Sequence, residues 1–342
     1  MKKVQEPTVT KTLTMAASRT YWRPLIGLLT AIVVMSVVVL SGEELKHLPP
    51  VAPSFAVLYS FGGYPTDGTN PQAGLLRDAA GNLYGTTFYG GSGNCFDIYA
   101  SLAGCGVVFK LSAMGTEKVL YSFAGPPDGQ YPVAGLTQDA AGNLYGTTEF
   151  GGVYNDYCEN PNPHNAYTCG VVFKLSPSGT ETVLHTFAGR PTDGGNPYAG
   201  LLRDAAGNLY GTTLNGGAHG SGVVFKLSPT GTETLLHTFT GPDGARPSAG
   251  LIKDTLGNLY GTTEIGGACA YTGDGCGVVF ELIRCSSSPS GYDFKVLHTF
   301  TGGADGAYPV AALVRDAAGN LYGTTSQGGG THNGGVVFRL TP

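Results

Sequence analysis

The sequence predicts an all-β fold, a five-bladed β-propeller built from four-stranded antiparallel blades. The hexapeptide NLYGTT occurs five times, and successive copies are 50 to 65 residues apart, within the range of repeat architectures. Each repeat contains four short β-rich runs bounded by Gly, Pro, Asp and Asn, which is the strand count of a propeller blade. The copies of NLYGTT begin at Asn82, Asn143, Asn208, Asn258 and Asn320.

Within a repeat the predicted strands follow a fixed order: A-G-L, then LYGTT, then VVFKL, then VLHTF or a close variant of each. The third run is apolar on consecutive residues, as in residues 106–109. Such a run indicates burial on both faces of the strand, as stacked blades provide. D-A-A-G-N and S-P-S-G-T separate the runs and are typical of turns, because Asp or Ser caps the turn and Gly accepts a positive φ.

The order of the runs also predicts how the ring closes. The fifth repeat stops after its third strand, at residues 336–340, and a spare fourth strand, VLYSF, stands at the other end of the domain, at residues 57–61. We expect residues 57–61 to pair beside residues 336–340 and to close the last blade, which removes exposed edges. A larger ring made by two chains is disfavoured, because the five copies supply both closing partners.

Composition excludes several classes. Of 342 residues 55 are Gly, 42% are hydrophobic and 13% are charged, so there is enough apolar material to fold and charge-driven disorder is excluded. Gly does not recur at every third position, which excludes collagen. The net charge is −5, but residues 1–23 carry +4, which leaves −9 for the rest of the chain. An acidic folded region argues against nucleic acid as a partner.

The N-terminal part predicts export and anchoring. Residues 1–23 are basic, residues 24–42 form one uncharged apolar run, residues 43–55 are a Pro-containing linker, and residues 56–342 hold the propeller. The run is long enough to span a bilayer, and the positive-inside rule leaves the N-terminus in the cytoplasm and the propeller on the periplasmic or extracellular side. Alternatively, residues 24–42 are a cleaved signal peptide and the domain is secreted. A buried cytoplasmic helix is the least favoured alternative.

Cysteine usage agrees with export. Only the three longest segments between NLYGTT and GVVF contain two cysteines each, which predicts the disulfides Cys95–Cys105, Cys158–Cys169 and Cys269–Cys276. Disulfides require an oxidising compartment. Chance pairs of buried thiols are the alternative, and zinc is disfavoured because no C-x-x-C is present. Cys285 is left over, and we expect a free thiol or an intermolecular bond there.

The repeat is specific enough to compare with known families. D-A-A-G-N-L-Y-G-T-T, G-G and G-V-V-F-K-L-S-P-S-G-T-E-T-V-L-H-T-F resemble the bacterial GloVer (Gloeobacter/Verrucomicrobia-type) tandem repeat with varied anchors, over about residues 56–342. More distantly, D-x-x-G-N-L-Y-G-T resembles blades of two-component-regulator sensor propellers. The resemblance implies an exported, surface-attached repeat protein and supplies no catalytic residue. The chain departs from it in having no C-terminal sorting tail, so residues 24–42 would take the anchoring role.

Topology places the candidate ligand site. The loops after NLYGTT and the D-G loops between blades share one end of the blades, and variable loops on a rigid scaffold are where binding usually occurs. The D-G aspartates could form a ring of carboxylates for a cation or for sugar hydroxyls, but capping of their own turns is the favoured interpretation. Tyrosines on the same loops could stack on sugars or dock proteins. The candidate ligand-binding residues are Asp67, Asp128, Asp193, Asp243, Asp305, Tyr89, Tyr154 and Tyr271.

Catalysis has only weak support in the sequence. Glu149 and Glu264 occupy the same position, directly after NLYGTT, and paired carboxylates serve glycosidases. However, the same position holds Phe88, Leu214 and Ser326 in the other copies, which favours a tolerant loop position. There is no P-loop, HExxH, nucleophile elbow or spaced metal motif, so we predict no cofactor and no metal.

We therefore expect a binding or interaction module at the cell envelope, for a glycan or an envelope protein, rather than an enzyme. The alternative is a polysaccharide-active glycoside hydrolase or lyase on a five-bladed propeller.

Overall fold

In the computed structural model, the described residues are 54–96, 101–158, 168–269 and 273–342. The predicted basic segment (1–23), the predicted anchor (24–42) and the linker up to residue 53 lie outside them. Among the described residues, none belongs to a helix with the length and apolar character needed to cross a membrane. The chain divides into two units, residues 1–55 and 56–342, and the second contains the repeats.

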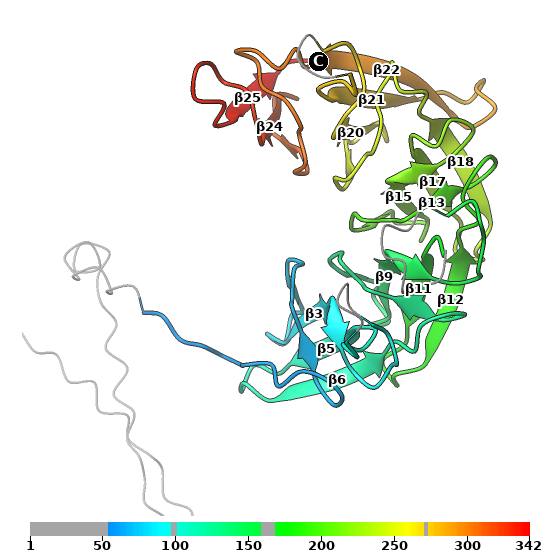
Figure 1. The fold of residues 1–342 in the computed structure, drawn as a ribbon, viewed down its shortest axis with the longest axis vertical. Helices are drawn as coiled ribbons and strands as arrows, with labels where there is room; N and C mark the ends of the chain where they lie inside the picture. Colours follow the sequence, from blue (N-terminus) through cyan, green and yellow to red (C-terminus); the bar gives the residue numbers. More distant parts are fainter. Residues whose placement is uncertain (1–53, 97–100, 159–167, 270–272) are drawn as a thin grey trace, which may run out of the picture. The chain divides into compact units, whose positions relative to one another are not determined.

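The second unit is all-β and antiparallel, as expected. The first three repeats each fold into one four-stranded sheet, whose strands lie in the order in which they occur in the chain (Figure 1). These sheets are β2 (Leu76–Arg77), β3 (Leu83–Thr87), β5 (Val107–Leu111) and β6 (Glu117–Ser122); β8 (Thr137–Gln138), β9 (Leu144–Thr148), β11 (Val171–Leu175) and β12 (Glu181–Thr186); and β14 (Leu202–Arg203), β15 (Leu209–Thr213), β17 (Val223–Leu227) and β18 (Glu233–Thr238).

The fourth repeat gives a fourth such sheet and the fifth repeat a sheet of three strands. Three additional two-stranded sheets join each of the first three D-G loops to the segment that follows LYGTT. The last two repeat sheets are β19 (Ile252–Lys253), β20 (Leu259–Thr263), β21 (Val278–Arg284) and β22 (Tyr292–Thr299); and β23 (Val314–Arg315), β24 (Leu321–Thr325) and β25 (Val336–Leu340). The small sheets pair β1 (Gly68–Thr69) with β4 (Tyr89–Gly90), β7 (Gly129–Gln130) with β10 (Phe150–Gly151), and β13 (Gly194–Gly195) with β16 (Asn215–Gly216).

Consecutive sheets contact each other through phenylalanines. The residue that follows the fourth strand of one sheet packs its ring edge-on against the Phe in the third strand of the next, because edge-to-face geometry is favourable for aromatic pairs. Phe187, directly after β12 of the second sheet, packs on Phe225 of β17 in the third sheet with 5.1 Å between ring centroids, and both rings are fully buried. The equivalent pairs are Phe123–Phe173, Phe239–Phe280 and Phe300–Phe338.

The glycine of LYGTT makes room for this ring. Gly211 on β15 lies opposite Phe225 on β17, and a Cβ at Gly211 would lie 2.6 Å from the Phe225 Cζ atom. Such a distance is far inside van der Waals contact, so no larger residue fits without displacing the ring. The glycine of the repeat is therefore a packing requirement and not only a turn residue.

The expected closing strand is absent from the structure. The last sheet has three strands, residues 57–61 are not in a strand, and Val337 on β25 is 82% exposed. Residues 57–61 instead contact the first sheet: the Tyr59 hydroxyl donates to Asp67 (2.7 Å), and Phe61 packs edge-on against Phe109 with 5.0 Å between centroids. The predicted pairing with β25 is therefore not seen in this structure, and the contacts of the segment are with Asp67 and with the first sheet.

Buried carboxylates also lie where consecutive sheets meet. Glu181, the first residue of β12, is close enough to Asp128 for the two charges to interact, and its Oε1 atom is buried without a hydrogen-bond partner. Burial, with a contribution from the charge of Asp128, raises the pKa of Glu181 to about 7. A carboxylic acid with a raised pKa in the folded state binds its proton more tightly there than in the unfolded chain, so its stabilising contribution is lost as the pH rises from about 5 to about 7.

We predict that Glu181→Gln raises the unfolding temperature at pH 8 and changes it little at pH 5. Gln removes a negative charge that the Glu181 side chain carries at pH 8 but not at pH 5. Thermal unfolding of both proteins at the two pH values measures this. Asp293→Asn, at an exposed position of β22, is the matched control and should show no such pH dependence. Equal effects of Glu181→Gln at both pH values would contradict the prediction.

Candidate functional site

The predicted ring of aspartates is engaged in its own turns. Asp193 is buried, its Oδ1 accepts the N–H of Gly194 (2.6 Å) and its Oδ2 accepts the N–H of Ala188 (2.7 Å). A Tyr or His on the preceding strand or segment contacts the same carboxylate in every repeat. These pairs are Tyr59–Asp67, Tyr121–Asp128, His185–Asp193, His237–Asp243 and His298–Asp305. These hydrogen bonds agree with the turn-capping interpretation of the five aspartates.

The third residue after each of these aspartates has an unusual backbone. Its φ is between 54° and 60°, it is never Gly, and a Pro follows it directly. Positive φ is disfavoured for residues with a Cβ, and a following Pro disfavours any helical conformation further. Strain of this kind costs about 1–3 kcal/mol and is found preferentially at functional sites. The five residues are Asn70, Tyr131, Asn196, Arg246 and Tyr308.

Two backbone hydrogen bonds hold four of the five strained residues, and Asn70 has the second of these, accepted by its carbonyl. The N–H of Asn196 donates to the carbonyl of Cys169 (2.7 Å), and its carbonyl accepts the N–H of Leu214 (3.0 Å). Leu214 is the residue directly after LYGTT, the position at which Glu149 and Glu264 stand in other repeats. The backbone therefore joins two variable residues in every repeat, which we call the paired positions. They are Asn70 with Phe88, Tyr131 with Glu149, Asn196 with Leu214, Arg246 with Glu264, and Tyr308 with Ser326.

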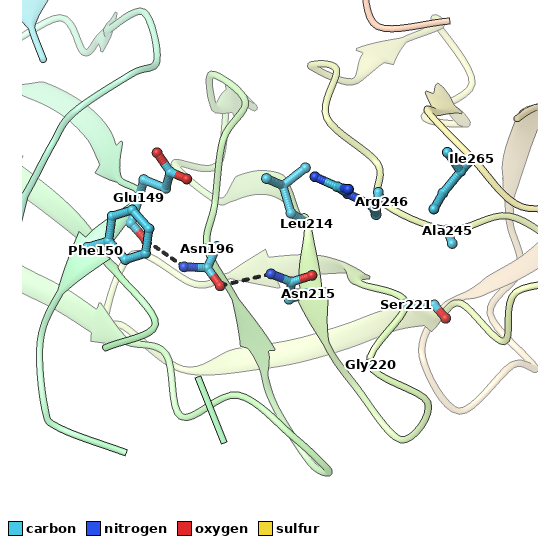
Figure 2. A pocket seen from close by; sticks show the side chains of 10 residues that line it. All are labelled: Glu149, Phe150, Asn196, Leu214, Asn215, Gly220, Ser221, Ala245, Arg246 and Ile265. Carbon is cyan, nitrogen blue, oxygen red and sulfur yellow. Dashed lines mark hydrogen bonds between the residues drawn. The ribbon is translucent and has the colours of Figure 1, made fainter. Parts of the chain in front are cut away.

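Residues at the paired positions line a cavity of about 620 Å³. Figure 2 shows Glu149, Asn196, Leu214 and Arg246 around it, with Leu214 between the carboxylate and the guanidinium in this view. The Asn196 side-chain amide donates to the carbonyl of Glu149 (3.2 Å), and the Asn215 amide donates to Asn196 Oδ1 (3.1 Å). Apolar side chains complete the lining, namely Phe150, Leu214, Ala245 and Ile265.

The electrostatics of this region are distinctive. Burial raises the pKa of Glu149 to about 7, so at neutral pH this side chain is present in both its acid and its carboxylate form. Burial, together with the charges of Glu149 and Glu264, also raises the pKa of Tyr198, so both carboxylates act on one phenol. Arg246 Nε lies 3.8 Å from Glu264 Oε2. The two predicted catalytic candidates thus influence one region of the molecule.

The predicted tyrosines differ in their surroundings. Tyr89 is half-buried in an aromatic cluster, where its ring centroid lies 4.6 Å from that of Phe88 and 5.2 Å from that of Tyr131. Tyr154 is 57% exposed. Tyr271 lies outside the described residues. Tyr89 is therefore a packing residue in this structure, whereas Tyr154 presents its side chain to solvent.

The cysteines are arranged as expected in the loops after LYGTT. Disulfides join Cys95 to Cys105, Cys158 to Cys169 and Cys269 to Cys276. Cys285 is a free thiol, and its Sγ lies 3.0 Å from the Ser287 hydroxyl oxygen. Cys169 and Cys276 also supply the carbonyls that hold the strained residues Asn196 and Tyr308, so the disulfides lie next to the paired positions.

Five homologous antiparallel sheets in tandem, with variable residues on a repeated backbone, define an all-β tandem repeat protein. The chain belongs to the Gloeobacter/Verrucomicrobia repeat family, whose model matches residues 45–157 and 162–342.

A comparison with curated protein sequences finds no significant match. Among solved structures, the chain is similar to a gluconolactonase from Xanthomonas campestris, with 16% identity and a TM-score of 0.41 over 79% of this chain and 71% of that one. It is also similar to the virginiamycin B lyase from Staphylococcus aureus, with 14% identity and a TM-score of 0.37 over 80% of this chain and 85% of that one.

A third similar structure is the extracellular domain of a protein described as a hybrid two-component system from B. thetaiotaomicron. The identity is 14% and the TM-score 0.39, over 77% of this chain and 33% of that one. Identities and TM-scores this low do not transfer an activity.

We predict that Asn70→Ala lowers the free energy of unfolding by about 1 kcal/mol, because Ala is disfavoured at positive φ, whereas Asn70→Gly leaves it unchanged or raises it. Asn70 is exposed, so neither change removes buried packing. Urea unfolding of the three proteins measures the difference. The same loss for Ala and for Gly would show that the backbone at this position is not strained.

Proposed function

We propose that this protein is a binding module whose ligand is a glycan, recognised at the cavity formed by the paired positions around Glu149, Asn196 and Arg246. The observation that supports this most directly is the strained backbone: five equivalent positions adopt the same disfavoured conformation although their side chains differ. A conformation kept with Asn, Tyr and Arg alike presents those side chains to solvent or a ligand, as expected of a recognition surface.

The chemistry of the cavity suits a sugar. A carboxyl group, two amides and a guanidinium offer donors and acceptors for hydroxyl groups, and Leu214, Phe150 and Ile265 offer apolar surface for the C–H faces of a pyranose ring. Because Glu149 exists in both forms near neutral pH, it can donate or accept a hydrogen bond. An envelope protein is the alternative ligand, and the exposed Tyr154 would then contribute to the contact surface.

We further propose that the module lies outside the cytoplasm. Three disulfides support an oxidising compartment. In this proposal residues 24–42 anchor the chain with its N-terminus in the cytoplasm, or are cleaved and release the domain.

We predict that Arg246→Ala and Glu149→Gln each weaken glycan binding about 10- to 100-fold, the equivalent of one charged hydrogen bond. An array of envelope and extracellular polysaccharide fragments identifies the ligand, and calorimetry then measures the affinities. Asp293→Asn, which lies outside the cavity, should bind as the unmodified protein does. Unchanged affinity in both cavity variants would contradict the proposed site.

A polysaccharide-active glycoside hydrolase or lyase is the second candidate, and the raised pKa of Glu149 favours it. A general acid needs a pKa near the working pH, and Glu149 meets this condition. The turnover assay uses the glycans that bind. Product formation abolished by Glu149→Gln or by Glu264→Gln would establish catalysis in place of simple binding.

We also propose that the five sheets close into a five-bladed propeller with residues 57–61 as the fourth strand of the last sheet. Phe61 contacts Phe109 just as Phe187 contacts Phe225, so the segment already makes the contacts of a fourth strand toward the first sheet. Its other side, including Val57, is exposed, and so is Val337 on the unpaired edge of β25. Closure would bury both.

The pairing of β17 with β18 supplies the expected register. Val223 lies opposite Thr238 there, so Val336 should lie opposite Ser60. We predict that Ser60→Cys with Val336→Cys, in a Cys285→Ser background, forms a disulfide within one chain, seen by non-reducing peptide mapping. Ser60→Cys with Arg339→Cys is the control, because a shift of three residues moves the sulfurs about 10 Å apart. No cross-link, or one between two chains, would refute closure of a single-chain ring.

A further inference from the structure

Three potential metal ligands meet between the second and third sheets. His185 is on β12, Asp193 is in the loop that follows it, and Glu233 begins β18. His185 Nε2 lies 3.2 Å from Asp193 Oδ2 and 3.7 Å from Glu233 Oε1, and all three ligand atoms lie within 4.8 Å of one another. We propose that these side chains bind one zinc ion, which joins the two sheets.

The geometry and burial of the group suit a metal. Imidazole nitrogen and carboxylate oxygen are both zinc ligands with bond lengths near 2 Å, so atoms bound to one ion lie about 3–4 Å apart. The side chains of His185, Asp193 and Glu233 are only 17%, 11% and 15% exposed.

Glu233 differs from its counterparts by the imidazole beside it. The Oε1 atoms of Glu117, Glu181 and Glu233 are all buried without a hydrogen-bond partner among the described residues, but only that of Glu233 faces both a carboxylate, Asp193, and an imidazole nitrogen, His185 Nε2 at 3.7 Å. Two carboxyl groups beside one imidazole are costly to ionise together out of water, and a divalent cation bound between them would offset that cost. The Ala188 N–H, which donates to Asp193 Oδ2, would hold that ligand in orientation.

The other interfaces between sheets each lack one member of the His, Asp and Glu group. The two preceding interfaces keep both carboxylates but have a tyrosine where His185 stands: Tyr59 with Asp67 and Glu117, and Tyr121 with Asp128 and Glu181. At the following interface His237 keeps its Asp243, but Phe294 replaces the glutamate and stacks on the imidazole with 3.6 Å between centroids. Within the described part of the chain, His, Asp and Glu meet together only at the interface of β12 and β18.

The neighbouring interfaces also supply the variants that test the proposal. His185→Tyr installs the residue that the first two interfaces carry, which fits the same surroundings, and Glu233→Gln keeps the shape of the ligand. His237→Tyr makes the same exchange at the interface that lacks the carboxylate and is the matched control.

The full chain is treated with a chelator, and Zn²⁺ is then added back and followed by calorimetry; Co²⁺ is added separately and followed by visible absorption. We expect one zinc per chain, a higher unfolding temperature with zinc, and the d–d bands of a nitrogen- and oxygen-ligated Co²⁺. His185→Tyr and Glu233→Gln should each lower the zinc affinity by at least about 100-fold, because each removes a direct ligand. His237→Tyr should bind zinc as the unmodified chain does.

Two results would overturn the proposal. One is the absence of zinc binding by the unmodified chain. The other is binding that persists in both His185→Tyr and Glu233→Gln, which would place the ion elsewhere. If His185→Tyr fails to fold, Glu233→Gln alone decides between these outcomes. Glycan binding at the cavity is measured on other residues and does not depend on this result.

Discussion

The edge-to-face contact between phenylalanines of successive sheets is the interaction on which the rest of the structure depends. Each buried ring, such as Phe225, needs a neighbouring strand without a side chain, and Gly211 supplies that space. It also needs a ring from the preceding sheet, which Phe187 supplies. The repeat therefore cannot bury its aromatic core alone, and each sheet completes the core of the next.

The residues that hold the fold are different from the variable residues that line the proposed ligand cavity. The aspartates of the D-G loops accept backbone N–H groups of their own turns, as Asp193 does with both carboxylate oxygens, and so fix the backbone that follows. Three residues later the chain enters its strained conformation before a proline, and the side chain there is free to differ between repeats. Rigid turns and variable side chains are thus adjacent in every copy.

Much of the fold could be predicted from the sequence, because NLYGTT recurs in all five repeats and VVFKL in three, with VVFEL and VVFRL in the other two. The disulfides were predictable because cysteine pairs occur only in the longest loops. The pairing of residues 57–61 with the last sheet is not seen in this structure and stays a prediction, since a periodic pattern cannot tell whether the segment that Tyr59 and Phe61 hold to the first sheet also joins the last. The strained positions had a signal in D-G-x-X-P, but their φ depends on carbonyls such as that of Cys169, far away in sequence. The group around His185 joins three segments, and no local motif reports it.

The strained residues before proline have a consequence for how such a protein can change. Since the same backbone conformation is kept with Asn, Tyr and Arg, the chemistry of the cavity can be altered one repeat at a time without a change in the framework. Exchange of segments between copies of the repeat would then yield new combinations of ten side chains on an unchanged scaffold. In a tandem array of this kind, the order of the repeats determines which side chains meet at the paired positions.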